Sequence, residues 1–283
     1  MLGTAMPLSL TDLGLGILLP AVISAVIVLL AGRLVRAERT RVFPATAFAL
    51  ATAAGLAALD LVPWQPESHW HWMPWLLMAS AIPSCLPDKR GWLRLQWIGW
   101  LALIGAASVL LVPDWKDLIA SQNVLRASLC CLAIVNAVTF AACVRNAAPT
   151  WVLRHLVIGT LLMSVLLLLS GSLLFSQIGL AGFGASCGLL FAEWRGAKMS
   201  VMTLAVPVSL FFAGMMLIAQ VNSYSSVPAV AYLLCAVHPT VVGVCGRAEK
   251  RPRSFIRFCI SELPAGVALA AVAWAAYAEY GPQ

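Results

Sequence analysis

The sequence has few charged side chains. Its 283 residues include 18 Lys and Arg and 11 Asp and Glu, together 10% of the chain, while 61% of the residues are hydrophobic. A soluble globular protein carries about 25% charged residues. A transmembrane helix needs about 20 mainly apolar residues. The composition therefore predicts an all-α, polytopic integral membrane bundle, in which residues 1–283 form one transmembrane domain without a soluble domain.

The sequence also lacks several short motifs that indicate chemistry. It contains no HExxH zinc motif, no CxxC pair and no lysine in the middle of an apolar stretch. The eight cysteines lie in apolar stretches or near basic residues, where a free thiol usually serves as a small buried side chain. We therefore predict no catalytic residue and no cofactor, and we favour a protein that is not an enzyme.

Basic residues occur on alternate connections between the apolar stretches, and the connections between them carry only Lys116 and Arg126. Because Lys and Arg are retained on the cytoplasmic side, this alternation predicts about ten crossings, with the N-terminus and the C-terminus both outside. The five basic groups are Arg33, Arg36, Arg39 and Arg41; Lys89, Arg90 and Arg94; Arg145 and Arg154; Arg195 and Lys198; and Arg247, Lys250, Arg251, Arg253 and Arg257.

The third expected span is the weakest because it is short and contains Pro74 and Pro83. A short tilted helix and a re-entrant segment both fit this stretch, and the charge alternation favours a crossing. The ten expected spans are approximately 14–32, 43–62, 73–87, 95–113, 123–143, 151–171, 177–194, 200–221, 227–245 and 262–279.

Small residues recur at helical spacing in three of these spans. Gly184 and Gly188 form a GxxxG pair in the seventh span, and Ala51 with Gly55 has the same spacing in the second. Gly266 and Ala270 repeat it in the tenth. Such residues let two helix backbones approach closely. We predict that these faces pack within the chain, with dimerisation as the alternative.

A Trp-rich outer segment, 63–75, contains Glu67, His69 and His71. Indole rings favour the lipid–water boundary, so an aromatic belt with its polar residues in water explains the segment without a function. In an extended segment the two histidines and Glu67 would instead share one face. Such a face is a weak candidate for a metal site or for sensing external pH, because histidine titrates near neutrality.

Polar residues within or beside the apolar stretches suggest a cavity. His238 lies about ten residues into the ninth span and precedes Pro239, and ionisable residues at this depth usually have a function. A neutral histidine bonded to a neighbouring helix is the structural alternative. Glu262 is expected to interact with the positive end of the last helix dipole. The candidate cavity residues are His238, Asn136, Ser186, Gln177, Gln220 and Asn222.

These features favour a permease for a small uncharged or weakly polar solute over a non-catalytic membrane subunit or scaffold. A membrane enzyme or sensor that uses the His69 and His71 segment is a third alternative. The expected partners are the bilayer, with anionic lipid at the basic inner connections, and a further membrane protein. No basic module for nucleic acid is present. The residue usage suggests a bacterial inner membrane.

Overall fold

The computed structural model describes residues 10–34, 43–61, 63, 65–84, 90–115, 119–145, 147–223, 225–248 and 255–280. Within these residues all regular secondary structure is helical. The first helices are α1 (Leu10–Leu13), η1 (Gly14–Leu18), α2 (Leu19–Leu34), α3 (Phe43–Ala58), η3 (His69–His71), α4 (Trp72–Ser84), α5 (Arg90–Leu110) and α6 (Ile119–Val144). They are followed by α7 (Pro149–Leu169), α8 (Leu173–Trp194), η5 (Val201–Leu204), α9 (Ala205–Asn222), α10 (Ala229–Ala236), α11 (His238–Ala248) and α12 (Phe255–Tyr280).

Six helical stretches are long and apolar enough to cross a membrane, so the chain is a multi-pass membrane protein. They are Thr11–Arg33, Ser121–Ala142, Pro149–Leu169, Leu173–Trp194, Val201–Asn222 and Ala229–Gly246. Each of the ten expected spans overlaps a helix, and the ninth overlaps both α10 and α11. The number of crossings stays a prediction, because the other helices are shorter or less apolar.

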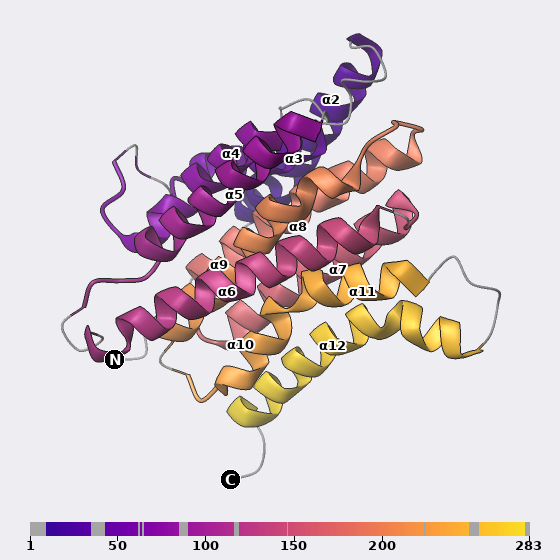
Figure 1. Cartoon of the computed structure of the whole chain (residues 1–283). Helices are drawn as coiled ribbons and strands as arrows, with labels where there is room; N and C mark the ends of the chain where they lie inside the picture. The colour runs from indigo at the N-terminus through magenta and orange to yellow at the C-terminus, as the bar shows by residue number, and fades with distance from the viewer. Residues whose placement is uncertain are drawn as a thin grey trace.

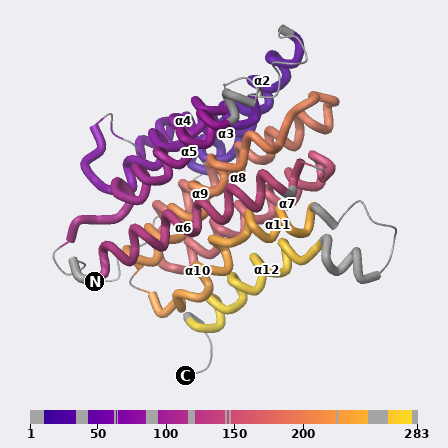
Figure 2. The backbone as a smooth tube through the Cα atoms, in the orientation of Figure 1, coloured from indigo at the N-terminus to yellow at the C-terminus, as the bar shows by residue number. Residues whose placement is uncertain are grey.

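Successive helices run back and forth between two ends of the bundle (Figures 1 and 2). We call one the basic end, because the described basic residues Arg33, Arg94, Arg145, Arg195 and Lys198 lie at or near helix termini there. The opposite end, which contains Ser172, Ser223 and Ser226, is called the polar end. This geometry agrees with the charge alternation, but it does not show which end faces the cytoplasm. Most of the basic connection expected to bind anionic lipid, 249–254, is outside the described residues.

Helix α9 lies inside the bundle and packs against α4, α6 and α10, among others. Every side chain from Ala205 to Ala219 is buried, and Phe211 and Phe212 are among the largest buried side chains. The apolar character of α9 on all sides explains this position, because an amphipathic helix would expose its polar face. Helices α2 and α12 instead lie at the periphery (Figure 1).

The GxxxG pair of α8 packs against the first span. A Cβ atom on Gly184 would lie 2.3 Å from the carbonyl oxygen of Ile17, and one on Gly188 would lie 2.0 Å from that of Ala21. Ser24 reinforces the contact by donating to the Ala185 carbonyl at 2.8 Å. The predicted packing within the chain is confirmed for this pair. Gly266 of α12 differs, because open space lies beside it.

The short third span runs along the length of α9. Asn222, the last residue of α9, is hydrogen-bonded to His69 at 3.0 Å. At the opposite end, Ser84 donates to the Thr203 carbonyl, which precedes α9, at 3.5 Å. The stretch 69–84 therefore reaches from the polar end to the basic end, despite its two prolines. A re-entrant segment would return to the end from which it started, so this geometry favours the crossing.

Candidate functional site

The ninth span is broken near its middle. Helix α10 ends at Ala236, Val237 forms a turn, and α11 begins at His238. Pro239 has no N–H, so the Cys235 carbonyl loses its helical hydrogen-bond partner. The eight residues of α10 and the eleven of α11 place the break roughly 12 Å from one end of the span and 16 Å from the other. The break therefore lies at mid-bundle depth.

Side chains of α6 compensate for the break. Asn136, which is fully buried, donates from Nδ2 to the Ala236 carbonyl at 2.8 Å. Its Oδ1 accepts a hydrogen bond of 2.6 Å from Thr240, and the Thr240 hydroxyl lies 2.9 Å from that of Thr139. A buried carbonyl without a partner would cost about 1–3 kcal/mol, so these bonds stabilise the interruption between α10 and α11.

His238 occupies the break and contacts a second helix. Its Nε2 lies 2.9 Å from the carbonyl oxygen of His155 in α7, and because a carbonyl only accepts, Nε2 carries the proton. The ring stacks on Phe212 with centroids 5.4 Å apart. It also fills the space beside Gly159, where a Cβ atom would lie 2.3 Å from Nε2. Glycine at 159 is therefore required for this contact.

The second ring nitrogen of His238, Nδ1, is buried and makes no hydrogen bond with the described residues. In the neutral tautomer Nδ1 carries a lone pair, which is an acceptor for a hydroxyl or an amide N–H. The site thus combines a histidine acceptor, a capped carbonyl and a discontinuous helix.

A second buried histidine, His155, links this site to the basic end. Its Nδ1 is hydrogen-bonded to the Trp151 carbonyl at 2.9 Å, and its Nε2 lies 3.8 Å from Glu262. Glu262 also forms an ion pair with Arg154. The expected dipole role of Glu262 is wrong, since α12 begins at Phe255 and Glu262 lies two turns inside it. His155 was missed because the adjacent Arg154 suggested an exposed helix end.

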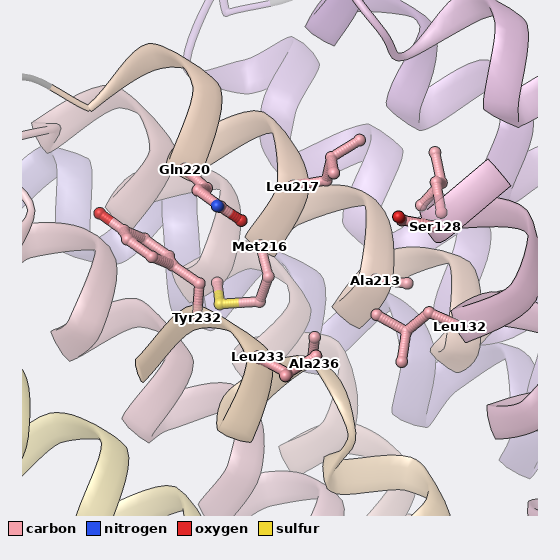
Figure 3. A pocket seen from close by; sticks show the side chains of 10 residues that line it. Ser128, Leu132, Ala213, Met216, Leu217, Gln220, Tyr232, Leu233 and Ala236 are labelled. Carbon is pink, nitrogen blue, oxygen red and sulfur yellow. The ribbon is translucent and has the colours of Figure 1, made fainter. Parts of the chain in front are cut away.

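A small apolar crevice adjoins the break. It has a volume of about 130 Å³ and opens between α6, α9 and α10. Figure 3 shows Ser128 and Leu132 on one side and Tyr232 on the other, with Gln220 at the polar end. The break produces this space because α11 packs along α6, whereas α10 packs mainly on α9 and α12. The crevice ends at Ala236, the last residue before the break.

The six predicted cavity residues do not meet in one place. Asn136 and His238 lie on either side of the break, and Gln220 lines the adjoining crevice. Asn222 lies at the polar end beside His69, and Gln177 is half-buried in the first turns of α8. Neither His238 nor Asn136 lines the crevice in this conformation.

Ser186 lies in the middle of α8 and donates to the Gly182 carbonyl of its own helix at 2.9 Å. The run from Gly184 to Gly188 spells GxSxG, the pattern of a nucleophile elbow. Such an elbow requires a sharp turn between a strand and a helix. A serine inside a continuous helix cannot provide that geometry, so Ser186 has a packing role here.

The outer histidines do not form a metal site with Glu67. The segment is a 3-10 turn rather than an extended strand, because His71 Nδ1 accepts from the backbone N–H groups of Glu67 and Ser68, each at 3.1 Å. His71 is therefore used as a backbone acceptor, and the expectation of three side chains on one face is wrong. Among the described residues, no three His, Cys, Asp or Glu side chains converge on a metal position.

His69 is neutral in this arrangement. Because Asn222 Nδ2 is a donor, His69 Nε2 accepts the hydrogen bond between them and carries no proton. Burial, followed by repulsion from His71, lowers the pKa of His69 to about 4. A histidine with this pKa does not respond to pH changes near neutrality.

Comparisons with known proteins reveal no relative: no protein-family model, curated protein or solved structure matches the chain. Function must therefore be inferred from the chain itself.

Proposed function

We propose that the protein is a permease for a small uncharged or weakly polar solute, in the inner membrane of a bacterium. The observation that supports this function is the mid-span break, where His238 and the Asn136-capped carbonyl are fully buried. Membrane helices are rarely interrupted without a reason, because an unsatisfied backbone group costs several kcal/mol in lipid. In transporters, discontinuous helices near the bilayer midplane form solute sites.

The polar groups at the break have the chemistry for such a solute. Nδ1 of His238 offers a buried acceptor, and Asn136 and Thr240 can exchange their mutual hydrogen bond for one with a solute hydroxyl or amide. These groups carry no formal charge when histidine is neutral, which suits an uncharged ligand.

The crevice beside α10 leaves room for this helix to move. Because α10 does not pack along α6, it has apolar space on one side and a hinge at Val237. Closure of α10 onto α6 would fill the crevice and change access to the break. This is a small hinge motion of the kind that transporters use for alternating access.

Osmotic swelling of proteoliposomes tests the proposal without a labelled solute. Vesicles that contain the protein are exposed to gradients of glycerol, urea, neutral sugars and amino acids, and light scattering reports entry. We expect at least one solute to enter faster than in empty vesicles. His238→Gln, which removes the ring from the break, should slow that entry by about tenfold, the equivalent of one hydrogen bond to the solute.

Ser176→Ala is the matched control. Ser176 is buried and donates to the Ser164 carbonyl of a neighbouring helix at 3.0 Å, but it lies away from the break. Its loss should leave the entry rate within about twofold. If no solute enters faster than in empty vesicles, or if both variants behave alike, the permease is wrong. A stoichiometric partner that co-purifies in mild detergent would then support the scaffold alternative.

A further inference from the structure

A second, larger hollow lies at the polar end of the bundle. Its volume is about 540 Å³, and it is bounded by the segment around His69, the end of α5 with the turn after it, α6 and the last residue of α9. Among the described residues, three charged side chains line it: Glu67, Asp114 and Arg126. The side chains of Trp72 and Trp115 add apolar surface to its lining. This hollow is separate from the broken helix, whose residues do not contribute to its lining.

Arg126 is the unusual member of this lining. It lies in the second turn of α6, inside a stretch apolar enough to cross a membrane. Its Nε is buried and has no hydrogen-bond partner among the described residues. A guanidinium has five N–H donors and no acceptor, so a buried N–H without a partner is costly.

Of the lining carboxylates, Asp114 is bonded to a neighbour of Arg126 on α6. Gln122, one helical turn earlier, donates to Asp114 Oδ1 at 2.9 Å and to the Pro113 carbonyl at 3.2 Å. Gln122 therefore fixes the turn against α6 and holds Asp114 in the lining of the same hollow as Arg126. Glu67 is exposed on another wall of the hollow. One guanidinium and two carboxylates thus line the same hollow.

The remaining polar groups in the lining are neutral. His69 accepts a hydrogen bond from Asn222, which requires an unprotonated Nε2. Among the described lining residues, the charge comes from one guanidinium and two carboxylates. A simple anion would meet two repelling carboxylates, and a simple cation would leave the guanidinium without a partner.

We propose that this hollow binds a small zwitterion, whose carboxylate pairs with Arg126 and whose ammonium group lies toward Glu67 and Asp114. The arginine fork matches a carboxylate with two parallel hydrogen bonds, which would satisfy its buried Nε. The tryptophan walls accept an apolar substituent, so amino acids with aliphatic side chains fit this chemistry. Binding here does not depend on passage through the break.

Calorimetric titration of the purified full-length protein in detergent tests this site. The probes are the zwitterions glycine, L-alanine and L-leucine. Acetate, which has only the carboxylate, and methylammonium, which has only the ammonium group, are tested beside them. At least one zwitterion should bind, and acetate and methylammonium should each bind at least about tenfold more weakly, because each makes only one of the two charged contacts. Arg126→Gln should weaken the zwitterion at least about tenfold, and Arg126→Lys should also weaken it because the fork is lost.

Glu67→Gln provides an independent variant at an exposed position, where folding is not at risk. It should weaken the zwitterion and strengthen acetate, since one repelling carboxylate is removed. Arg195→Gln, at the basic end, should change neither affinity. The proposal is overturned if no zwitterion binds, if acetate binds as tightly as the zwitterion, or if Glu67→Gln and a folded Arg126→Gln protein both retain wild-type affinities. Titration measures binding alone, so its result is independent of the swelling assay.

Discussion

Two neighbouring helices of this bundle contain a proline at about the same depth, yet only one of them breaks. In α12, Pro264 is the tenth residue, and the helix continues from Phe255 to Tyr280. In the span beside it, Pro239 lies ten residues after the start of α10, and the helix is interrupted at Val237. Both prolines remove an N–H, so the missing donor alone does not decide the outcome.

The difference lies in what the neighbouring helices offer. At the break, Asn136 binds the Ala236 carbonyl, and His238 is held by the His155 carbonyl and the space beside Gly159. The peripheral position of α12 gives Pro264 no comparable set of donors among the described residues. A proline permits a break, and side chains on adjacent helices stabilise it.

The largest effect is expected at Gly159. Gly159→Ala would place a Cβ atom 2.3 Å from the His238 ring, so the ring must leave the break. We expect a loss of about 3 kcal/mol in the free energy of unfolding, from overpacking and the lost hydrogen bond. Gly266→Ala, in α12, meets open space and should instead stabilise the protein by up to about 1 kcal/mol, because alanine favours a helix over glycine. Denaturant titration in detergent measures both, and equal effects would contradict the role of Gly159.

Loss of Asn136 should have the next largest effect. Asn136→Leu leaves the buried Ala236 carbonyl without its side-chain donor, so we expect a cost of about 2 kcal/mol. Thr240→Val removes only the hydrogen bond to Asn136 Oδ1 and should cost about 1 kcal/mol. The same titration compares them. A larger cost for Thr240→Val would show that Asn136 does not support the break.

Replacing each proline sharpens the comparison directly. Pro264→Ala restores an N–H in a helix that is already continuous, so we expect about 1 kcal/mol of stabilisation. Pro239→Ala should stabilise by less, because Asn136 already binds one freed carbonyl and the His238 contact favours the break. Hydrogen exchange of residues 233–241 in Pro239→Ala should match that of the unmodified chain. Stronger protection there would show that the proline alone breaks the helix.

The last comparison concerns His69, a partly buried histidine at the polar end. His69 accepts a hydrogen bond, whereas His238 donates one, and burial lowers the pKa of His69 to about 4. The unfolded chain therefore binds the proton more readily, and stability should fall as the pH decreases from about 6.5 to 4. His69→Gln should reduce this slope in pH-dependent unfolding. An unchanged slope would show that His69 is not the group that titrates.

Much of the fold followed from local patterns in the sequence. Apolar length gave the helix positions, since every expected span overlaps a helix, and small-residue spacing gave the contact of Gly184 and Gly188 with the first span. His238 and Asn136 were identified by their polarity within apolar stretches, although their partners were not. His71 was misjudged because hydrogen bonds from the backbone of Glu67 and Ser68 turn the segment.

The sequence by itself determined that this chain is a helical membrane protein, because hydrophobicity and charge act residue by residue and require no knowledge of neighbours. Only the tertiary structure decided that Pro239 interrupts its helix while Pro264 does not, and that Arg126 lines a hollow together with Glu67 and Asp114. These outcomes depend on donors and acceptors that lie about 100 residues away along the chain, as Asn136 does from Ala236. Spacing along one helix contains no information about such partners.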